Sequence, residues 1–251
     1  MSGPTRITAI VVSRGLDALL RACLDHLRRA LAAVGTADAE HRIVVVDDAS
    51  PHPYRRDALG APPPELLRLD VHRSFAHANG LAARRFPNDL YLLLNNDVLL
   101  AEDALARMTA LLARVPRAGI CGSRLVFPDA TIQHHGVVFG AGERGPYHAD
   151  RLRPGHLVPR ASREWQAVTG ACMLVRAALW TELGGLDESY PFGLEDVDLC
   201  LRARARGWRV VCCEDTDSLH FESMTDGRVA LDVPSRRLFT ERWGGRYAID
   251  G

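Results

Sequence analysis

Residues 43–50 read I-V-V-V-D-D-A-S, four β-branched apolar residues followed directly by two acidic residues and a turn. A short apolar run bounded by polar turn residues predicts a strand that is buried on both faces. Two further runs have the same texture, I-T-A-I-V-V at 7–12 and L-Y-L-L-L at 90–94, and a shorter one lies at 66–71. Apolar residues recur at helical spacing between and after these runs, which predicts helices over 16–34, 76–85 and 101–114.

Strands that alternate with helices indicate βαβ units and therefore a mostly parallel sheet. Such a sheet binds ligands beyond the carboxyl ends of its strands. The polar residues at those ends are Asp47 and Asp48 after the second strand and Asn95-Asn96-Asp97 after the fourth. A binding site is therefore expected where these side chains emerge.

The texture of the sequence changes after Pro116. Strands are predicted over 119–127 and 131–139, around the turn Pro128-Asp129. Residues 140–163 are rich in Gly, Pro, Arg and His and show no period, so a mobile loop over a site is expected there. No linker is visible, and one domain is expected. The later pattern predicts a strand over 168–176, helices over 177–183 and 195–206, and a strand over 209–213.

Composition excludes several classes of protein. With 47% hydrophobic residues, 25% charged residues and a formal net charge of zero, the chain is globular and lacks the basic surface of a nucleic-acid binder. All 31 basic residues are arginine, which excludes pyridoxal Schiff bases and the lysine-containing phosphate loop. The six cysteines have no C-x-x-C spacing, so reduced core residues are expected, with a zinc site as the minor alternative. No signal peptide and no apolar run of about 18 residues is visible, so a cytoplasmic protein is expected.

The acidic residues after the second and fourth strands are the first candidates for chemistry. A carboxylate such as Asp97, at the end of a rigid strand, suits a hard divalent cation, although Asn and Asp are also favoured simply as turn residues. Asp47 and Asp48 can accept hydrogen bonds from a nucleobase or a ribose hydroxyl. The alternative is that they only shape the turn before Ser50-Pro51.

Two further candidates lie late in the chain. The run E-D-V-D at 195–198 opens a helix and carries more acid than a helix cap requires, so one carboxylate is a candidate general base. An ordinary acidic first turn is the alternative. His220 lies between Leu219 and Phe221 and is either a packed structural residue or a ligand for manganese or zinc. If it lies beside Asp97, the two residues supply part of an octahedral site to which a diphosphate adds oxygens.

The order of these motifs resembles the family 2 glycosyltransferases of the GT-A fold, in the branch similar to rhamnosyltransferases and O-antigen enzymes. The resemblance runs from about residue 7 to residue 225 and rests on I-V-V-V-D-D-A-S (43–50), L-L-L-N-N-D-V (92–98), G-S-R-L-V-F-P-D-A-T-I-Q-H-H-G (122–136), V-T-G-A-C-M-L-V-R (168–176), G-G-L-D (184–187), E-D-V-D-L-C-L-R (195–202) and H-F-E-S-M-T (220–225). It implies an α/β, GT-A type single domain, with a mostly parallel Rossmann-like sheet flanked by helices and a smaller mixed sheet on the acceptor side. It also implies a nucleotide-donor half over about 1–115, an acceptor and catalytic half over about 116–232, and a C-terminal helix or tail over 233–251.

The resemblance assigns roles to particular residues. Asp97 matches the last residue of the family's D-x-D element, where Asn95 has lost the first carboxylate, and Asp97 and His220 are the implied ligands of Mn²⁺ or Mg²⁺. Glu195-Asp196 matches the E-D element, so both are implied catalytic residues with Asp196 as the general base. The residues implied to bind the donor are Asp47, Asp48, Asn95, Asn96, Gly170 and Ala171.

The implied activity is inverting, metal-assisted transfer of a sugar from a nucleotide-diphosphate donor to a hydroxyl of a glycan, lipid-linked or small-molecule acceptor. Such an enzyme serves polysaccharide or glycoconjugate biosynthesis. The sequence departs from the family at Ser13-Arg14-Gly15, where a Thr-Tyr-Asn-like element is usual, and at Ser74, where glycine is usual before Phe75. A stacking aromatic for the nucleobase is therefore absent after the first strand.

The sequence is also compatible with other functions and with other roles for two of its segments. A non-catalytic sugar-nucleotide-binding domain is compatible with the reduced Asn95-Asn96-Asp97, and a sugar-nucleotide nucleotidyltransferase is the second alternative. The segment 140–163 carries Arg144, His148, Arg151 and Arg153, and either closes over phosphate or acceptor or is a surface loop. The stretch 233–243 either packs on the core as a helix or touches the inner face of a membrane that bears the acceptor. At most peripheral membrane contact is expected.

Overall fold

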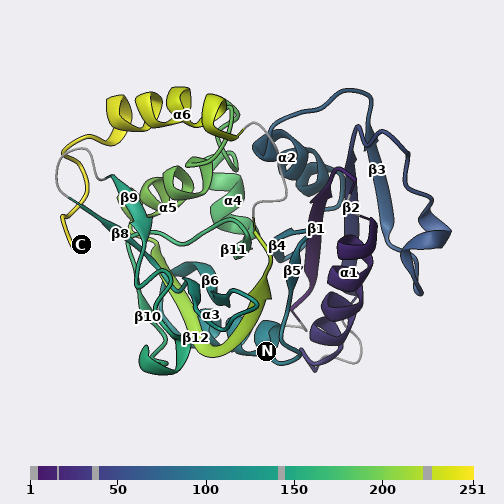
Figure 1. Cartoon of the computed structure of the whole chain (residues 1–251), viewed down its shortest axis with the longest axis horizontal. Coiled ribbons are helices and arrows are strands. Elements are labelled where there is room, and N and C mark those ends of the chain that lie inside the picture. Colours follow the sequence, from purple (N-terminus) through teal and green to yellow (C-terminus); the bar gives the residue numbers. More distant parts are fainter. Residues whose placement is uncertain (1–4, 16, 36–39, 141–144, 223–227) are drawn as a thin grey trace.

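The structure is a computed structural model that describes residues 5–15, 17–35, 40–140, 145–222 and 228–251. A large sheet runs through the molecule in the strand order β10-β12-β6-β11-β4-β1-β2-β3, and β8 and β9 form a separate two-stranded sheet. Figure 1 shows β1–β3 with α1 and α2 on one side of the view, and β8–β10 with α5 and α6 on the other. The two halves of the sequence therefore lie side by side along one continuous sheet.

The first half of the sheet is parallel, as predicted, and consists of β1 (Ile7–Ser13), β2 (Arg42–Asp48), β3 (Glu65–Leu69) and β4 (Leu90–Asn95). In β1, Ile10 pairs with Val44 of β2 on one side and with Leu93 of β4 on the other. Val44, Val45 and Val46 are fully buried because both faces of the sheet are covered, which explains the unbroken apolar run. Parallel strands end at one edge, so the polar residues that follow β1, β2 and β4 are neighbours there.

The second half of the sheet is mixed. The strand β11 (Cys172–Arg176) lies antiparallel between β4 and β6 (Ala118–Val126), and β12 (Arg209–His220) pairs with β6 in parallel. The remaining strands pair antiparallel with β12 or β6 or with each other: β5 (Val98–Leu99), β7 (Ile132–His134), β10 (Arg163–Glu164), and the separate pair β8 (Val137–Phe139) and β9 (Pro146–His148).

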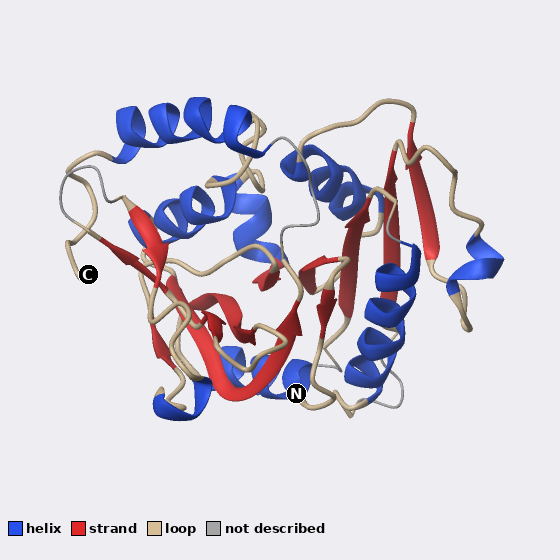
Figure 2. Ribbon diagram, viewed as in Figure 1, coloured by secondary structure: helices blue, strands red, loops and turns tan. Residues whose placement is uncertain are grey.

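Helices cover both faces of the large sheet, and Figure 2 shows the strands lying between them. The helices α1 (Asp17–Ala32) and α3 (Ala104–Arg114) contribute Leu24 and Met108 to the core on one face. The other face carries α2 (Phe75–Arg85), α4 (Ala177–Leu183), α5 (Glu195–Ala205) and α6 (Arg228–Trp243). Short 3₁₀ turns lie at Arg56–Leu59 and Gly155–Leu157.

The single strand predicted over 131–139 is wrong. The chain forms two short strands, β7 and β8, which belong to different sheets. The break lies at Gly136, where a Cβ would stand 2.1 Å from the ring of Trp165. The close approach of this ring requires glycine, and the chain changes direction there.

The segment 140–163 is not the structureless loop that its composition predicts. It contains β9, a 3₁₀ turn and the first residue of β10, while residues 141–144, including Arg144, lie outside the described residues. Its later part is held by the fully buried Arg124, whose guanidinium donates to the carbonyl of Gly155 at 2.6 Å and to that of Val158 at 3.1 Å. The side chains of Arg151 and Arg153 pair with Glu222 and Asp150.

The strand predicted over 209–213 extends to His220, with a register shift between Cys213 and Ser218. At the C-terminus, α6 packs on the core, which confirms that reading for residues 233–243. Phe239 is 3% exposed, and the buried carboxylate of Asp198 accepts bonds from Arg242 and Trp243, both at 2.9 Å. Within the described ranges, the structure has no helix with the length and apolarity of a membrane span.

Candidate active site

Asp97 and His220 meet at the edge of the sheet, in the middle of the molecule. Asp97 lies in the turn between β4 and β5, and His220 ends β12, where it pairs with Val98 of β5. This pairing brings Nε2 of His220 to 3.2 Å from Oδ1 of Asp97. The amide of Phe221 donates to the Asp97 carbonyl at 3.1 Å, which fixes the two chain segments relative to each other.

The two side chains fit a divalent cation. Apart from their contact with each other, Oδ1 of Asp97 and the ring nitrogens of His220 have no hydrogen-bond partner among the described residues, whereas buried polar atoms are normally paired. Two ligand atoms at right angles, each about 2.1 Å from an octahedral ion, lie about 3.0 Å apart, close to the separation seen here. The described residues hold no group of three or more His, Cys, Asp or Glu side chains suited to a metal ion. The other ligands of a cation here would therefore come from substrate or water.

The three residues before β11 connect this pair with the rest of the site. The carbonyl of Ala171 accepts the last amide of β4 at 2.9 Å. The amide of Gly170 donates to Oδ2 of Asp196 at 2.6 Å, and the amide of Thr169 donates to Nε2 of His134 at 3.3 Å. Three consecutive residues thus hold the end of β4, the first turn of α5 and the end of β7 together.

Gly170 allows α5 to approach closely. A Cβ at this position would lie 3.2 Å from the Cβ of Asp196 and 3.3 Å from the ring of Phe75. These distances are tighter than ordinary contacts, so a larger residue would push the Asp196 carboxylate away from its amide donor. The donor-binding role predicted for Gly170 and Ala171 stays a prediction. In the structure Ala171 is bonded to the end of β4 and Gly170 to Asp196.

Glu195 and Asp196 begin α5 in an environment that disfavours charge. Burial raises the pKa of both carboxyl groups, and in Glu195 the neighbouring Asp196 charge raises it further. Asp196 is half-buried and also accepts the Val197 amide at 2.8 Å, while the buried Oε2 of Glu195 has no hydrogen-bond partner in the part of the chain that the structure describes. A raised pKa suits proton abstraction near neutral pH, so the geometry is compatible with the base predicted at Asp196.

The pKa of Asp47 is lowered, in contrast to those of Glu195 and Asp196. Its fully buried carboxylate accepts the amides of Ser50 at 2.9 Å and Tyr54 at 3.2 Å, and the guanidinium of Arg68 at 2.5 Å. Burial alone would raise its pKa, but the bonds from Ser50, Arg68 and Tyr54 outweigh burial and lower it. The carboxylate orders the loop after β2, and its donor-binding role stays a prediction.

Asp48 is also paired within the chain. Its carboxylate contacts Nδ1 of His72 at 2.6 Å and accepts the amide of Arg73 at 2.8 Å. The side chains of Arg68 and His72 are 38% and 57% exposed. Asp47 and Asp48 therefore hold two side chains, Arg68 and His72, whose other atoms are accessible to solvent.

Asn96 ties the ends of the parallel strands together. Its Nδ2 donates to Oγ of Ser13 at 2.8 Å, and that hydroxyl also lies 2.8 Å from the hydroxyl of Tyr54. The predicted gathering of polar groups at the carboxyl ends of β1, β2 and β4 is therefore observed. Asn95 and Asn96 are half-buried, and their donor-binding role stays a prediction.

Sequence reasoning missed a histidine pair beside this site. His134, at the end of β7, and His148, at the end of β9, have their Nδ1 atoms 2.8 Å apart. His220 is close enough to contribute to lowering the pKa of both. The sequence placed His148 in a loop and gave His134 no role, because histidines in two short, irregular strands have no periodic signal.

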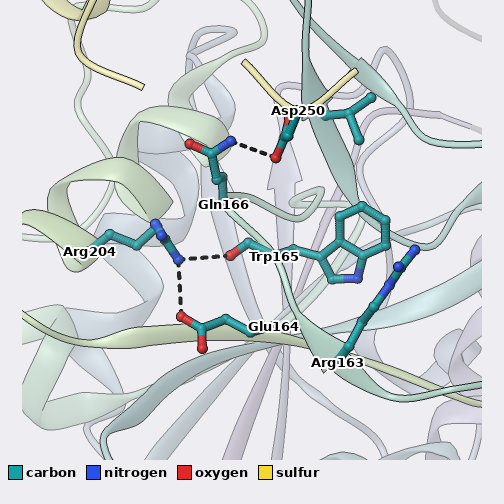
Figure 3. A pocket seen from close by; sticks show the side chains of 7 residues that line it. Arg163, Glu164, Trp165, Gln166, Arg204 and Asp250 are labelled. Atoms are coloured by element: carbon teal, nitrogen blue, oxygen red, sulfur yellow. Dashed lines mark hydrogen bonds and ion pairs between the residues drawn. The ribbon is translucent and has the colours of Figure 1, made fainter. Parts of the chain in front are cut away.

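A separate cavity of ≈ 410 Å³ lies near the C-terminus, and Figure 3 shows the side chains that line it. Its charged side chains are largely paired with each other or with the backbone, since Arg204 contacts Glu164 and the Trp165 carbonyl, and Gln166 contacts Asp250. None of the predicted site residues lines this cavity. The candidate active site is therefore the edge where Asp97, His220 and Asp196 lie.

Comparisons with known proteins identify the family of the chain. The model of a family described as "Glycosyltransferase like family 2" matches residues 4–225. The chain is 31% identical over 229 residues to the O-antigen biosynthesis protein RfbC of Myxococcus xanthus, covering 88% of this chain and 18% of that protein. It is 28% identical over 178 residues to an N-acetylglucosaminyl-diphospho-decaprenol L-rhamnosyltransferase of Mycobacterium tuberculosis, covering 63% of this chain and 56% of the relative. The chain thus spans only part of the length of these relatives.

Two solved structures share the fold. A mannosyltransferase from Pyrobaculum calidifontis, in complex with GDP-Man and Mn²⁺, superposes with a TM-score of 0.66 at 20% identity, over 94% of this chain and 61% of that one. GalNAc-T7 with UDP, GalNAc and Mn²⁺ superposes with a TM-score of 0.60 at 14% identity, over 88% of this chain and 44% of that one. At these identities the likeness establishes the architecture of the domain.

Proposed function

Because the chain belongs to glycosyltransferase-like family 2 and has the GT-A fold, we propose that it transfers a sugar from a nucleoside-diphosphate donor to an acceptor hydroxyl with inversion. The observation that carries the proposal is the approach of Asp97 Oδ1 and His220 Nε2 to 3.2 Å, with no other hydrogen-bond partner for either atom among the described residues. Both solved neighbours contain Mn²⁺, which supports Mn²⁺ or Mg²⁺ as the ion that this pair holds.

Each residue of the site has a definite task in this proposal. Asp97 and His220 hold the cation, which when bound offsets negative charge on the departing diphosphate. Asp196 takes the proton of the acceptor hydroxyl as that oxygen forms its bond to the anomeric carbon and the bond to the diphosphate breaks. The Gly170 amide, 2.6 Å from Asp196, fixes the direction of the carboxylate. Glu195 beside it raises the affinity of the pair for a proton through their mutual repulsion.

The donor and acceptor are proposed to bind on opposite sides of this centre. The residues up to about 115, with Gly170 and Ala171, form the donor side, and residues from about 116 to 232 form the acceptor side. The polar edge formed by Ser13, Asn96 and the loop after β2 supports a nucleotide position there. The 13–15 turn has no aromatic residue to stack on the base. Arg68 of β3 and His72, which follows β3, are partly exposed beside Asp47 and Asp48 and are proposed to contact the nucleotide.

The acceptor class is proposed from the relatives. One relative is named for O-antigen biosynthesis and another for a diphospho-decaprenol substrate, which supports a glycan or lipid-linked acceptor and a role in polysaccharide or glycoconjugate biosynthesis. A lipid-linked acceptor would require the enzyme to work at the inner face of a membrane, through at most peripheral contact.

A panel of nucleotide sugars with Mn²⁺ or Mg²⁺ tests the proposal. We expect one donor to bind only with metal and to release its diphosphate. Asp97→Ala should weaken metal-dependent donor binding at least about 30-fold, and Asp196→Asn should bind donor normally while kcat falls by about 10²–10⁴. Asp25→Asn, an exposed carboxylate on α1, is the matched control and should change neither value. Normal turnover by Asp196→Asn would rule out the assigned base.

The non-catalytic alternative rests on Asn95, which stands where the family has a carboxylate. It predicts metal-dependent donor binding without transfer to any acceptor and without slow diphosphate release. The nucleotidyltransferase alternative predicts consumption of a nucleoside triphosphate instead. The same panel, extended with triphosphates and sugar phosphates, separates all three activities.

A further inference from the structure

The hydrogen bonds around His134 determine which nitrogen carries its proton. A backbone amide can only donate, so Nε2 of His134, which receives the Thr169 amide at 3.3 Å, must present a lone pair. Burial, and then the neighbouring His148, His135 and His220, lower the pKa of His134 well below its usual value, so the ring is neutral. Its proton is therefore on Nδ1.

This assignment fixes the tautomer of the next ring. Nδ1 of His134 lies 2.8 Å from Nδ1 of His148 and donates its proton to it, so His148 accepts at Nδ1. Burial, and then the Arg151 charge, lower the pKa of His148 to about 4, so it too is neutral. A neutral imidazole that accepts at Nδ1 carries its proton at Nε2, and this N–H group is not used in the bond between the two rings.

The surroundings of His148 indicate what its N–H group meets. The ring is half-buried, at the end of β9, and it lies near His220, Arg151 and Glu222. Oε2 of Glu222 accepts from Arg151 at 2.9 Å and from Gln133 at 3.3 Å. His148 therefore carries an N–H group in the neighbourhood of the cation pair and of a guanidinium, where an anionic ligand of that cation would also be bound.

The neighbouring His135 shows the contrast. Its Nδ1 lies 3.0 Å from Glu214 and its Nε2 lies 3.1 Å from Asp150, so both nitrogens are used within the protein. Its ring also packs edge-on against Trp165. Of the two adjacent histidines, His135 joins structural elements, and His134 sets the hydrogen bonding of a third ring.

We propose that His134 holds His148 in its Nε2–H tautomer, and that this N–H group donates a hydrogen bond to a phosphoryl oxygen of the nucleoside diphosphate. The inference rests on the proposed function, because it uses the same site. His148 touches the ligand, and His134 acts through it as a positioning residue. A neutral donor serves here because it stabilises the phosphate oxygen without adding a positive charge beside the cation.

The tautomers can be measured without any substrate. Two-bond ¹H–¹⁵N correlation spectra of the histidine rings at pH 7 should show His148 protonated at Nε2 and His134 protonated at Nδ1, with assignments from His148→Gln and His134→Asn. In His134→Leu, the bond that fixes the tautomer is absent, and the Nε2–H form of His148 should no longer be the only one. A His148 ring protonated at Nδ1 in the wild type would overturn the inference.

Binding of UDP, GDP and TDP, each with Mn²⁺, tests the contact by titration calorimetry. The amide of Gln reaches the position of Nε2 and that of Asn reaches Nδ1, so His148→Gln should bind within about 3-fold of wild type. His148→Asn should bind at least about 10-fold more weakly, as for the loss of a bond to a charged group. His156→Asn, an exposed histidine of the following segment, is the control.

The outcomes separate this inference from the proposed function. If wild-type protein binds no nucleoside diphosphate with Mn²⁺, the proposed function fails. If wild type binds one and transfers sugar, but His148→Asn and His148→Gln bind equally well, only the role of His148 fails. Weakening by Asn with rescue by Gln, together with the predicted tautomers, supports the inference.

Discussion

The carboxylates after β2 and those around β4, β12 and α5 differ in how completely the protein satisfies them. Asp47 accepts two amides and a guanidinium, and these bonds lower its pKa although it is fully buried. Asp97 and Glu195 are almost as deeply buried, yet among the described residues Oδ1 of Asp97 contacts only His220 and Oε2 of Glu195 has no hydrogen-bond partner. The hydrogen bonds of Asp47 all come from the chain itself, whereas Asp97 and Glu195 each keep an oxygen available to a ligand.

This difference separates carboxylates that build the scaffold from those that face a ligand. Burying an unpaired polar group lowers stability, so an unpaired one persists where a ligand or a reaction uses it. Both regions lie along the same sheet, and in the sequence both are acidic residues that follow a strand or begin a helix. The partners of each carboxylate, rather than its position after a strand, therefore decide its role.

The largest expected effect on stability is at Asp47. Asp47→Ala leaves Arg68 and two amides without their acceptor and should lower the free energy of unfolding by about 3 kcal/mol, measured by urea denaturation without metal. The loss should be full at neutral pH and should shrink as pH falls through the lowered pKa of Asp47, because protonation removes the same contribution from wild type. Asp97→Ala is the comparison and should change stability by less than about 0.5 kcal/mol. If Asp97→Ala lowered the free energy of unfolding as much as Asp47→Ala, the distinction between scaffold carboxylates and ligand-facing carboxylates would be wrong.

A smaller effect of opposite sign is expected at Glu195. Its raised pKa means that its contribution to stability is present in acid and is lost as pH rises through the folded pKa. Glu195→Gln removes the buried charge, so at pH 8 to 9 it should raise the free energy of unfolding of the metal-free protein by about 1 kcal/mol. The gain should vanish near pH 4, where wild type is also uncharged. Destabilisation at pH 9 would show that Glu195 has a partner in the folded protein.

The sequence predicted the elements that follow from local pattern. The runs at 7–12, 43–46 and 90–94 became β1, β2 and β4 because continuous apolar residues suit a strand covered on both faces. The helix predicted over 177–183 has the observed bounds of α4. The meeting of Asp97 with His220 was expected from the order of motifs, and their contact at 3.2 Å agrees with it.

Features that depend on distant contacts could not be predicted. The strand β12 continues through the polar run from Glu214 to Ser218, which has no apolar pattern typical of a strand. These side chains are paired or buried through contacts with distant residues, which the local sequence does not indicate. The break at Gly136 depends on a ring from Trp165, 29 positions away (165 minus 136). The hydrogen bonding of Asp47 likewise depends on Arg68 of the next strand, and no sequence spacing predicts that pairing.

The central claim is that Asp97 and His220 bind one divalent cation together with the donor diphosphate. Electron spin echo spectroscopy of the protein with Mn²⁺ and a nucleoside diphosphate tests it directly. We predict that one Mn²⁺ centre couples to a directly bound ¹⁴N and to ³¹P, and that His220→Gln loses only the nitrogen coupling. A Mn²⁺ centre without coordinated nitrogen in the wild type, or one whose nitrogen coupling persists in His220→Gln, would contradict the claim.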